Sequence, residues 1–127
     1  MLRNIVLIAS LACAALPARA GPMDKALAKL APEERSQQAC VLKGLDAVRR
    51  DARLRRADRI SASLFAPAVL DGTLLTAKGG AIRVAERWYA LSFTCHLTGD
   101  LMKATSFAFA LGAEIPKESW DKLGLWG

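Results

Sequence analysis

The sequence has few of the residues on which most catalytic and metal sites depend. Its 127 residues include one histidine, His96, and three cysteines. No Gly-x-Ser-x-Gly motif, phosphate-binding loop or dinucleotide fingerprint is present. Zinc sites usually take four Cys, His or carboxylate ligands, which this chain does not supply convincingly. We therefore predict no metal, no cofactor and no catalytic residue. A Ser–His–Asp site that uses His96 is possible in principle, and a pair of carboxylates facing each other across a cleft is an arrangement that sequence alone cannot show.

Long apolar runs are also lacking beyond the first twenty residues. Residues 5–16 are apolar but too short to span a bilayer comfortably, and Arg3 precedes them. Ala18-Arg19-Ala20 has the small-x-small pattern of a cleavage site. We expect a cleaved signal peptide over 1–20, one domain over 21–127, a periplasmic location and no transmembrane segment after cleavage. The alternatives are an uncleaved anchor and a lipoprotein acylated at Cys13.

Positive charge is in modest excess. The formal net charge of +6 falls to +4 once Arg3 and Arg19 leave with the first twenty residues. Such a balance favours contact with anionic surfaces but does not indicate nucleic acid, which an exported protein seldom meets. The partners expected from composition are therefore an anionic envelope component or another envelope protein.

Cleavage leaves two cysteines, Cys40 and Cys95. An even pair in an exported protein indicates one disulfide, whereas a redox pair usually has the close Cys-x-x-Cys spacing. The bridge would close a loop of about 55 residues, for which the chain-entropy model gives an upper value of about 4 kcal/mol.

Residues 88–97 carry the clearest strand pattern. Side chains alternate between a bulky apolar face and a mixed face. The apolar face consists of Tyr89, Leu91, Phe93, Cys95 and Leu97, and the mixed face of Trp88, Ala90, Ser92, Thr94 and His96. After a turn at Gly99-Asp100, residues 101–111 alternate again, which predicts a hairpin. Shorter strands are predicted over 73–76 and 81–84, on either side of Gly79-Gly80.

Two helical segments frame these strands. Pro32, followed by two glutamates, suits a helix start, and an apolar stripe continues it until about Leu54. Gly44 within it either weakens the helix or allows a close approach to the sheet. Pro116 begins a short turn over 117–123, which Gly124 ends. The apolar stripe of the first segment consists of Val41, Leu45, Val48 and Ala52.

We predict an α+β fold: an N-terminal helix packed on a small antiparallel β-sheet, one disulfide and a short C-terminal helical turn.

Two groups of residues are candidates for binding. The first is an anionic-ligand patch at the charged end of the predicted helix, formed by Arg49, Arg53 and Arg56. Its alternative is a solvated helix surface with local ion pairs. The second is a binding face formed by Arg83, Arg87, Trp88 and His96. Its alternative is that the aromatic residues fill a small core and that His96 is an ordinary strand residue.

A wider set of residues forms a familiar pattern. It runs from Leu30, Pro32, Arg35, Gln38 and Cys40 through Gly80-Ala81-Ile82-Arg83 and Trp88–Cys95 to Met102-Lys103, Ser106-Phe107, Gly112, Ile115-Pro116, Trp120 and Gly124-Leu125-Trp126. This pattern resembles domain of unknown function family 930 (DUF930), a group of small exported bacterial proteins, from about Leu27 to Trp126. The resemblance implies export and two shared cysteines, but no activity. Lys43 stands where an acidic residue is frequent, and 54–70 matches poorly.

Together these observations predict an exported periplasmic protein that acts as a non-enzymatic binding or envelope-associated domain. Two alternatives stay open. One is a hydrolase acting on an envelope polymer, for which scattered carboxylates would have to meet in a cleft. The other is an inhibitor of such a hydrolase, with the basic helix or a loop as its contact surface.

Overall fold

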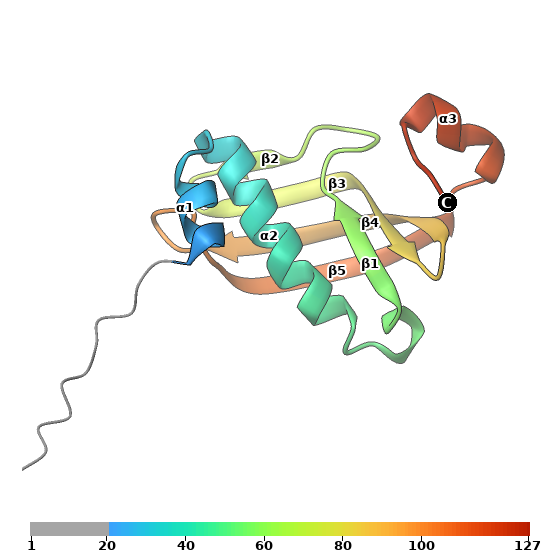
Figure 1. Cartoon of the computed structure of the whole chain (residues 1–127), viewed down its shortest axis with the longest axis horizontal. Coiled ribbons are helices and arrows are strands. Elements are labelled where there is room, and N and C mark those ends of the chain that lie inside the picture. Colours follow the sequence, from blue (N-terminus) through green and yellow to red (C-terminus); the bar gives the residue numbers. More distant parts are fainter. Residues whose placement is uncertain (1–20) are drawn as a thin grey trace, which may run out of the picture.

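The computed structural model describes residues 21–127, so the predicted signal peptide lies outside the described residues. Helices lie against a single antiparallel sheet (Figure 1). In chain order the elements are α1 (Pro22–Ala28), α2 (Pro32–Val48), the short 3₁₀ turn η1 (Ala52–Leu54), β1 (Ala57–Ser61), β2 (Val69–Asp71), β3 (Leu74–Val84), β4 (Arg87–Leu97), β5 (Ala104–Glu114), the 3₁₀ turn η2 (Lys117–Ser119) and α3 (Trp120–Leu123). The predicted α+β class is therefore confirmed.

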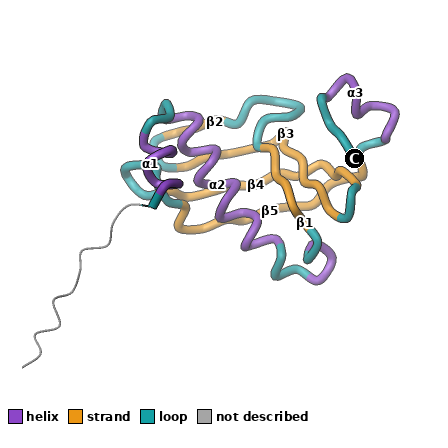
Figure 2. Tube along the Cα trace, viewed as in Figure 1, coloured by secondary structure: helices purple, strands orange, loops and turns teal. Residues whose placement is uncertain are grey.

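The sheet is built on three long strands in the order β3-β4-β5 (Figure 2). On the other side of β3, β1 pairs with its C-terminal half and β2 with its N-terminal half. The predicted hairpin is confirmed, with Phe93 opposite Phe109 and Cys95 opposite Phe107. Its second strand covers 104–114 rather than 101–111. The reason is that the chain turns over 98–103, where Leu101 has a φ of 62°.

The prediction of two short strands around Gly79-Gly80 is wrong, because β3 is one strand with a bulge between Ala77 and Gly80. The glycines serve close packing here. A β-carbon on Gly80 would lie 2.8 Å from the carbonyl oxygen of Ser61. The carbonyl oxygen of Gly79 accepts hydrogen bonds from the backbone N–H groups of Leu64 and Phe65. The bulge thus anchors the loop that follows β1.

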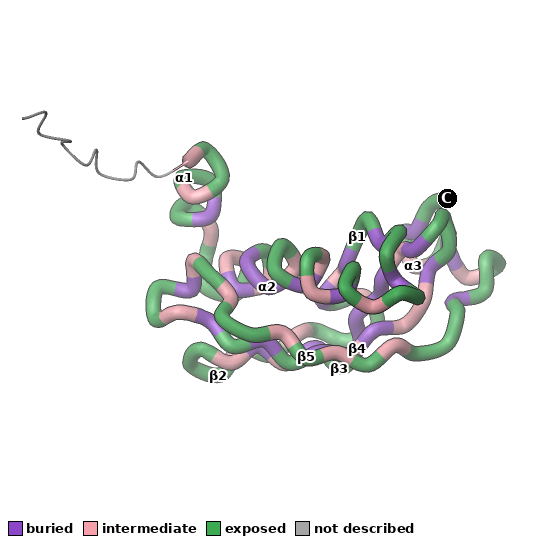
Figure 3. Tube along the Cα trace, turned by 90° about the horizontal axis from the view of Figure 1, so that it is seen from below, coloured by how far each residue is buried: buried purple, intermediate pink, exposed green. Residues whose placement is uncertain are grey.

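Helix α2 starts at Pro32 as predicted, but it ends at Val48 and not near Leu54. Its buried side faces the sheet through small residues: Ser36, Ala39, Cys40 and Gly44, with Val48 at the end. A β-carbon on Gly44 would lie 2.7 Å from the Phe107 ring, so Gly44 does allow a close approach. The helix forms a layer over one face of the sheet (Figure 3) and contacts both edge strands, β1 and β5.

The predicted disulfide is present between Cys40 of α2 and Cys95 of β4. It lies inside the larger hydrophobic cluster, between the helix and the sheet. The apolar face predicted for β4 is directed into this cluster, since Leu91, Phe93, Cys95 and Leu97 are buried and Tyr89 is partly buried.

Arg35 connects three segments at one end of this core. Its guanidinium donates hydrogen bonds to the carbonyl oxygens of Leu27 and Leu30 at 3.1 and 2.9 Å. It also donates to those of Ala28 and Asp100, both at 3.1 Å. The fork of five N–H donors thereby ties α1 and the β4–β5 turn to α2.

A smaller cluster lies beneath the C-terminal segment. It consists of Ala81, Trp88, Ile115, Trp120 and Leu125. The predicted helical turn is confirmed as η2 and α3, and Gly124 ends it with a left-handed φ of 70°. Both buried indoles donate to backbone oxygens, Trp120 to Ile115 at 3.0 Å and Trp88 to Trp126 at 2.8 Å.

Within residues 21–127, no helix combines the length and the apolar character needed to cross a bilayer.

Candidate functional site

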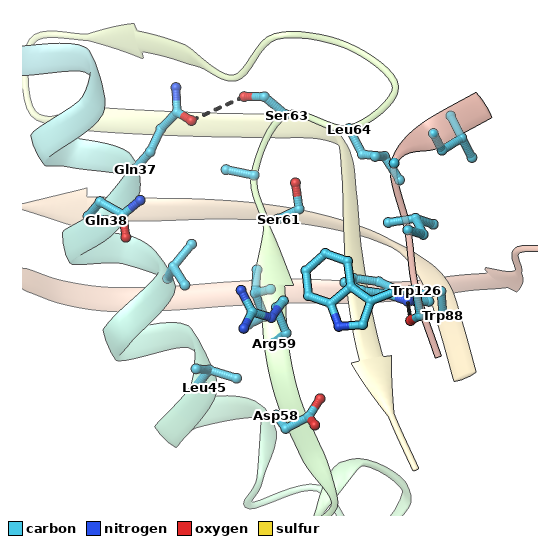
Figure 4. A pocket seen from close by; sticks show the side chains of 16 residues that line it. Gln37, Gln38, Leu45, Asp58, Arg59, Ser61, Ser63, Leu64, Trp88 and Trp126 are labelled. Atoms are coloured by element: carbon cyan, nitrogen blue, oxygen red, sulfur yellow. Dashed lines mark hydrogen bonds between the residues drawn. The ribbon is translucent and has the colours of Figure 1, made fainter. Parts of the chain in front are cut away.

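A groove of about 590 Å³ lies between α2, β1 and the C-terminal segment (Figure 4). It brings together parts of the chain that are distant in sequence. Its lining comprises Gln37, Gln38, Val41 and Leu45 of α2, Asp58 to Leu64 from β1 and the following loop, Trp88, and Leu123 to Trp126.

The α2 wall explains why part of the predicted apolar stripe is not core. Val41 and Leu45 are only partly buried, because they line the groove beside the buried row of Cys40 and Gly44. This correction follows from the close approach at Gly44, which turns the small residues of α2 toward the sheet. Val41 and Leu45 therefore supply an apolar surface that a ligand can contact, whereas Val48 of the same stripe is buried.

Polar side chains from α2, from β1 and from the loop after β1 also line the groove. The Ser63 hydroxyl donates to the side-chain oxygen of Gln37 at 3.3 Å (Figure 4). The same hydroxyl accepts a hydrogen bond from the backbone N–H of Ala68 at 2.9 Å, which fixes the loop after β1. Gln38 and Ser61 also line the groove. Amide and hydroxyl groups of this kind can donate or accept hydrogen bonds with a neutral polar ligand.

The opposite wall is formed by a stacked aromatic and cationic pair. The guanidinium carbon of Arg59 lies 4.8 Å from the ring centroid of Trp126. The Trp126 ring meets the buried Trp88 ring edge-on, at 5.9 Å between centroids and 71° between planes. Because its carbonyl oxygen also binds Trp88, Trp126 is held in place while its side chain stays 48% exposed. The result is an ordered aromatic surface with a cation on it.

The charges in the groove do not cancel. Asp58 accepts a hydrogen bond from Arg83 at 2.9 Å, and the Arg83 side chain is 15% exposed. Arg59 has no carboxylate partner within the described part of the chain. Asp58 is therefore matched by Arg83, and Arg59 leaves one positive charge on the groove wall. An anionic group entering the groove gains from this charge.

The groups that line the groove are of kinds that contact ligands by hydrogen bonds, stacking and charge. Asp58 is the one carboxylate among the groove residues, and it is already engaged by Arg83. Acid–base cleavage of a glycosidic bond takes two carboxyl groups in most glycoside hydrolases. Ser61 and Ser63 line the groove without a histidine or lysine among its residues to act as a base.

The predicted patch of Arg49, Arg53 and Arg56 lies outside this groove, in a different setting from the one expected. The three residues do not share a helix face, because α2 ends at Val48. Arg49 donates to the carbonyl oxygen of Ala57 at 2.8 Å, and Arg53 forms an ion pair with Asp51 at 2.7 Å. Side-chain and backbone hydrogen bonds from Arg53 lower the pKa of Asp51 to about 2. Arg56 is exposed. A role for this patch in binding stays a prediction.

The second predicted group does not form one site. Trp88 and His96 lie eight residues apart on β4, roughly 26 Å at about 3.3 Å per residue. His96 is exposed and Arg87 lies 3.8 Å from Glu114. The expectation that Trp88 is exposed on the mixed face is wrong, because the C-terminal segment covers it and leaves it 1% exposed. Trp88 instead lines the groove as a partner of Trp126, and Arg83 holds the groove residue Asp58.

Sequence reasoning missed Arg59, Gln37 and Trp126 as neighbours. In the sequence Arg59 is the last residue of the charged run that follows the predicted helix, and in the structure it belongs to β1. β1 gives little sequence signal, because Ala57 and Ile60 are buried with two charged residues between them and a bulge near Ala57 breaks the alternation expected of a strand.

Other parts of the surface are less suited to binding. A hollow of about 720 Å³ beside the β3–β4 turn is lined by Glu86, Arg87, Glu114 and Lys117, whose charges balance. No group of three or more His, Cys, Asp or Glu residues within 21–127 is placed to hold a metal ion.

The chain was compared with curated proteins, solved structures and family models. No curated protein and no solved structure matches it. The family model described as Domain of Unknown Function (DUF930) matches residues 27–125. This range includes the disulfide, the complete sheet, most of the groove and α3. The chain therefore belongs to the DUF930 family.

Proposed function

We propose that this chain is an exported, non-enzymatic binding protein whose groove takes an elongated envelope ligand with an anionic group. The observation that carries the proposal is Arg59, which lies on the exposed Trp126 ring without a carboxylate partner among the described residues. The ligand class follows from this pair and from the polar and apolar groups facing it.

Each wall of the groove suits one part of such a ligand. A guanidinium binds a carboxylate or phosphate in a bidentate manner. The Trp126 ring offers a flat apolar surface beside it, and the amides of Gln37 and Gln38 offer hydrogen bonds on the facing wall. Val41 and Leu45 add apolar contact between them. Peptidoglycan fragments combine these features, since they carry sugars, amides and free carboxylates. A phosphorylated lipid headgroup shares only the anion.

Export is inferred from three supporting features. Residues 1–20 have the composition of a signal peptide, so 21–127 would be the mature domain. A disulfide persists chiefly in oxidising compartments such as the periplasm. The excess of basic residues also suits an anionic envelope. Intact mass of the protein recovered from a periplasmic fraction tests this step. A retained N-terminus would contradict it.

Calorimetric titration of residues 21–127 with muramidase-released peptidoglycan fragments tests the groove. We expect micromolar binding that weakens at least ten-fold in Arg59→Gln, because the only unpaired guanidinium of the groove is lost. Lys78→Gln is the matched control, since it removes an exposed positive charge away from the groove. Titration with inorganic phosphate separates a general anion site from one that also requires the sugar and amide groups.

Two outcomes would contradict the proposal. One is wild-type affinity in Arg59→Gln together with loss of binding in Arg53→Gln/Arg56→Gln, which would favour the predicted arginine patch instead. The other is turnover of the fragments by the wild-type chain, abolished by a single carboxylate substitution, which would favour the hydrolase alternative.

A further inference from the structure

The two open edges of the sheet differ in how they are protected. On one side the edge is divided between β1 and β2, which have five and three residues. β1 also carries Asp58 and Arg59. On the other side, β5 is an edge of eleven residues that pairs only with β4 within the described chain. Figure 3 views the molecule toward this edge, and β5 runs beneath α2 without another strand beside it.

The β5 edge lacks the features that normally prevent strands from pairing between molecules. Natural edge strands are short or carry charges, proline or bulges that discourage a new neighbour. Between Lys103 and Glu114, β5 has no charged residue and no proline. Its pairing with β4 is regular from Ser106 to Leu111, since the two bulges lie near its ends.

The side chains of β5 leave room for a neighbouring strand on both faces of the sheet. Phe107, Phe109 and Leu111 pack against the larger cluster but remain only partly buried. On the other face, Ser106, Ala108 and Ala110 are small and exposed. A neighbouring strand would therefore cover aromatic surface on one face and meet no bulky residue on the other.

We propose that β5 pairs antiparallel with β5 of a second copy of this chain, which forms one continuous sheet across the dimer. The charges at the ends of the strand favour this occupant. Antiparallel pairing of two copies brings Lys103 of each near Glu114 of the other, whereas parallel pairing places like charges together. In a register centred on Ala108 or Phe109, the two copies also cover each other's aromatic side chains. Such an interface is isologous, as in most homodimers.

This inference is independent of the proposed function. The groove opens on the β1 side of α2, away from β5, so dimerisation would leave two grooves accessible. Its test measures mass rather than ligand binding, and either proposal can fail alone.

Sedimentation velocity of residues 21–127 over a range of concentrations tests the dimer. We expect a concentration-dependent dimer in the wild type. Ala108→Lys and Ala108→Glu each place like charges next to the two-fold axis, so each should raise the dimer dissociation constant at least ten-fold. An equimolar mixture of the two variants should recover the dimer, because opposite charges then meet.

Thr94→Lys is the matched control. Thr94 is exposed on the same face and lies directly opposite Ala108, but on β4, which is not an edge. It should dimerise as the wild type does. A wild-type chain that stays monomeric at millimolar concentration would overturn the inference. A dimer that both Ala108 variants leave intact would overturn it as well. A monomer that instead binds extended peptides along β5 would show that the edge serves another partner.

Discussion

The two hydrophobic clusters of the molecule are held together in different ways. The larger one lies between α2 and the sheet and is crosslinked by Cys40–Cys95. The smaller one lies under the C-terminal segment, where hydrogen bonds from Trp88 and Trp120 to backbone oxygens hold the chain. The groove lies between them. We infer that the larger cluster supplies most of the stability and that the smaller one supplies a surface for binding.

The largest effect is expected where the crosslink is removed. Cys40→Ala/Cys95→Ala frees a loop of 55 residues in the unfolded chain and should lower the free energy of unfolding by about 4 kcal/mol at most. Cys95→Ser should likewise reduce stability and export yield. Urea denaturation measures the first and periplasmic yield the second. Unchanged values in both would show that the disulfide is not the main support of the larger cluster.

A second test fills the space at the helix–sheet contact. Gly44→Val places a side chain against the Phe107 ring and Ile60, so we expect a loss of about 2 kcal/mol from overpacking. Adding Phe107→Leu makes room and should recover part of it. Urea denaturation of the two single variants and of the double variant measures the coupling. If the loss in the double variant equals the sum of the two single losses, Gly44 and Phe107 do not constrain each other.

Next to the smaller cluster, we expect a substitution to affect binding more than stability. Trp126→Ala removes the contacts of its ring with Arg59 and Trp88, which together are worth about 1–2 kcal/mol of stability. The backbone oxygen that binds Trp88 remains. Binding of peptidoglycan fragments should nevertheless fall at least ten-fold, because the aromatic wall is lost. Met23→Ala is a control, since it removes an exposed apolar side chain at the far end. A loss of stability without a loss of binding would contradict the division of roles.

The smallest effect concerns the ion pair between Asp51 and Arg53 at the η1 turn, which belongs to neither cluster. Arg53 lowers the pKa of Asp51 to about 2 in the folded protein, against an ordinary value of 3.8. The stability contributed by this carboxylate is present above the ordinary pKa and is lost as pH falls from about 4 toward 2. Asp51→Asn should therefore slightly flatten the acid limb of stability against pH. An unchanged acid limb would show that the exposed ion pair contributes nothing measurable.

The parts of the fold that were predictable rest on local patterns. The alternation of β4 and the Pro116–Gly124 boundaries each lie in one short stretch, and the disulfide follows from the count of two cysteines beyond the first twenty residues. Gly79-Gly80 has the pattern of a break between two strands, although in the structure those glycines serve contacts between β3 and a distant loop. The charged run beyond Val48 has a helical composition, so the sequence does not mark the end of α2.

The candidate site was less predictable than the fold. Its residues come from α2, β1 and the last residues of the chain, and no local pattern joins Gln37, Arg59 and Trp126. The burial of Trp88 likewise depends on a segment 38 residues later, which supplies the acceptor for its indole N–H. Alternation correctly placed Trp88 on the face opposite Tyr89, but only the path of the C-terminal segment decides that this face is covered.

We propose above all that this protein binds its ligand in the groove between α2, β1 and Trp126. Two-dimensional ¹H–¹⁵N NMR of residues 21–127, titrated with muramidase-released peptidoglycan fragments, tests it most directly. We predict shifts of the Trp126 indole N–H, of the Gln37 side-chain amide and of the Arg59 backbone amide, with Arg53 and His96 unmoved. Shifts confined to Arg53 and Arg56, or no shifts at saturating fragment concentration, would contradict it.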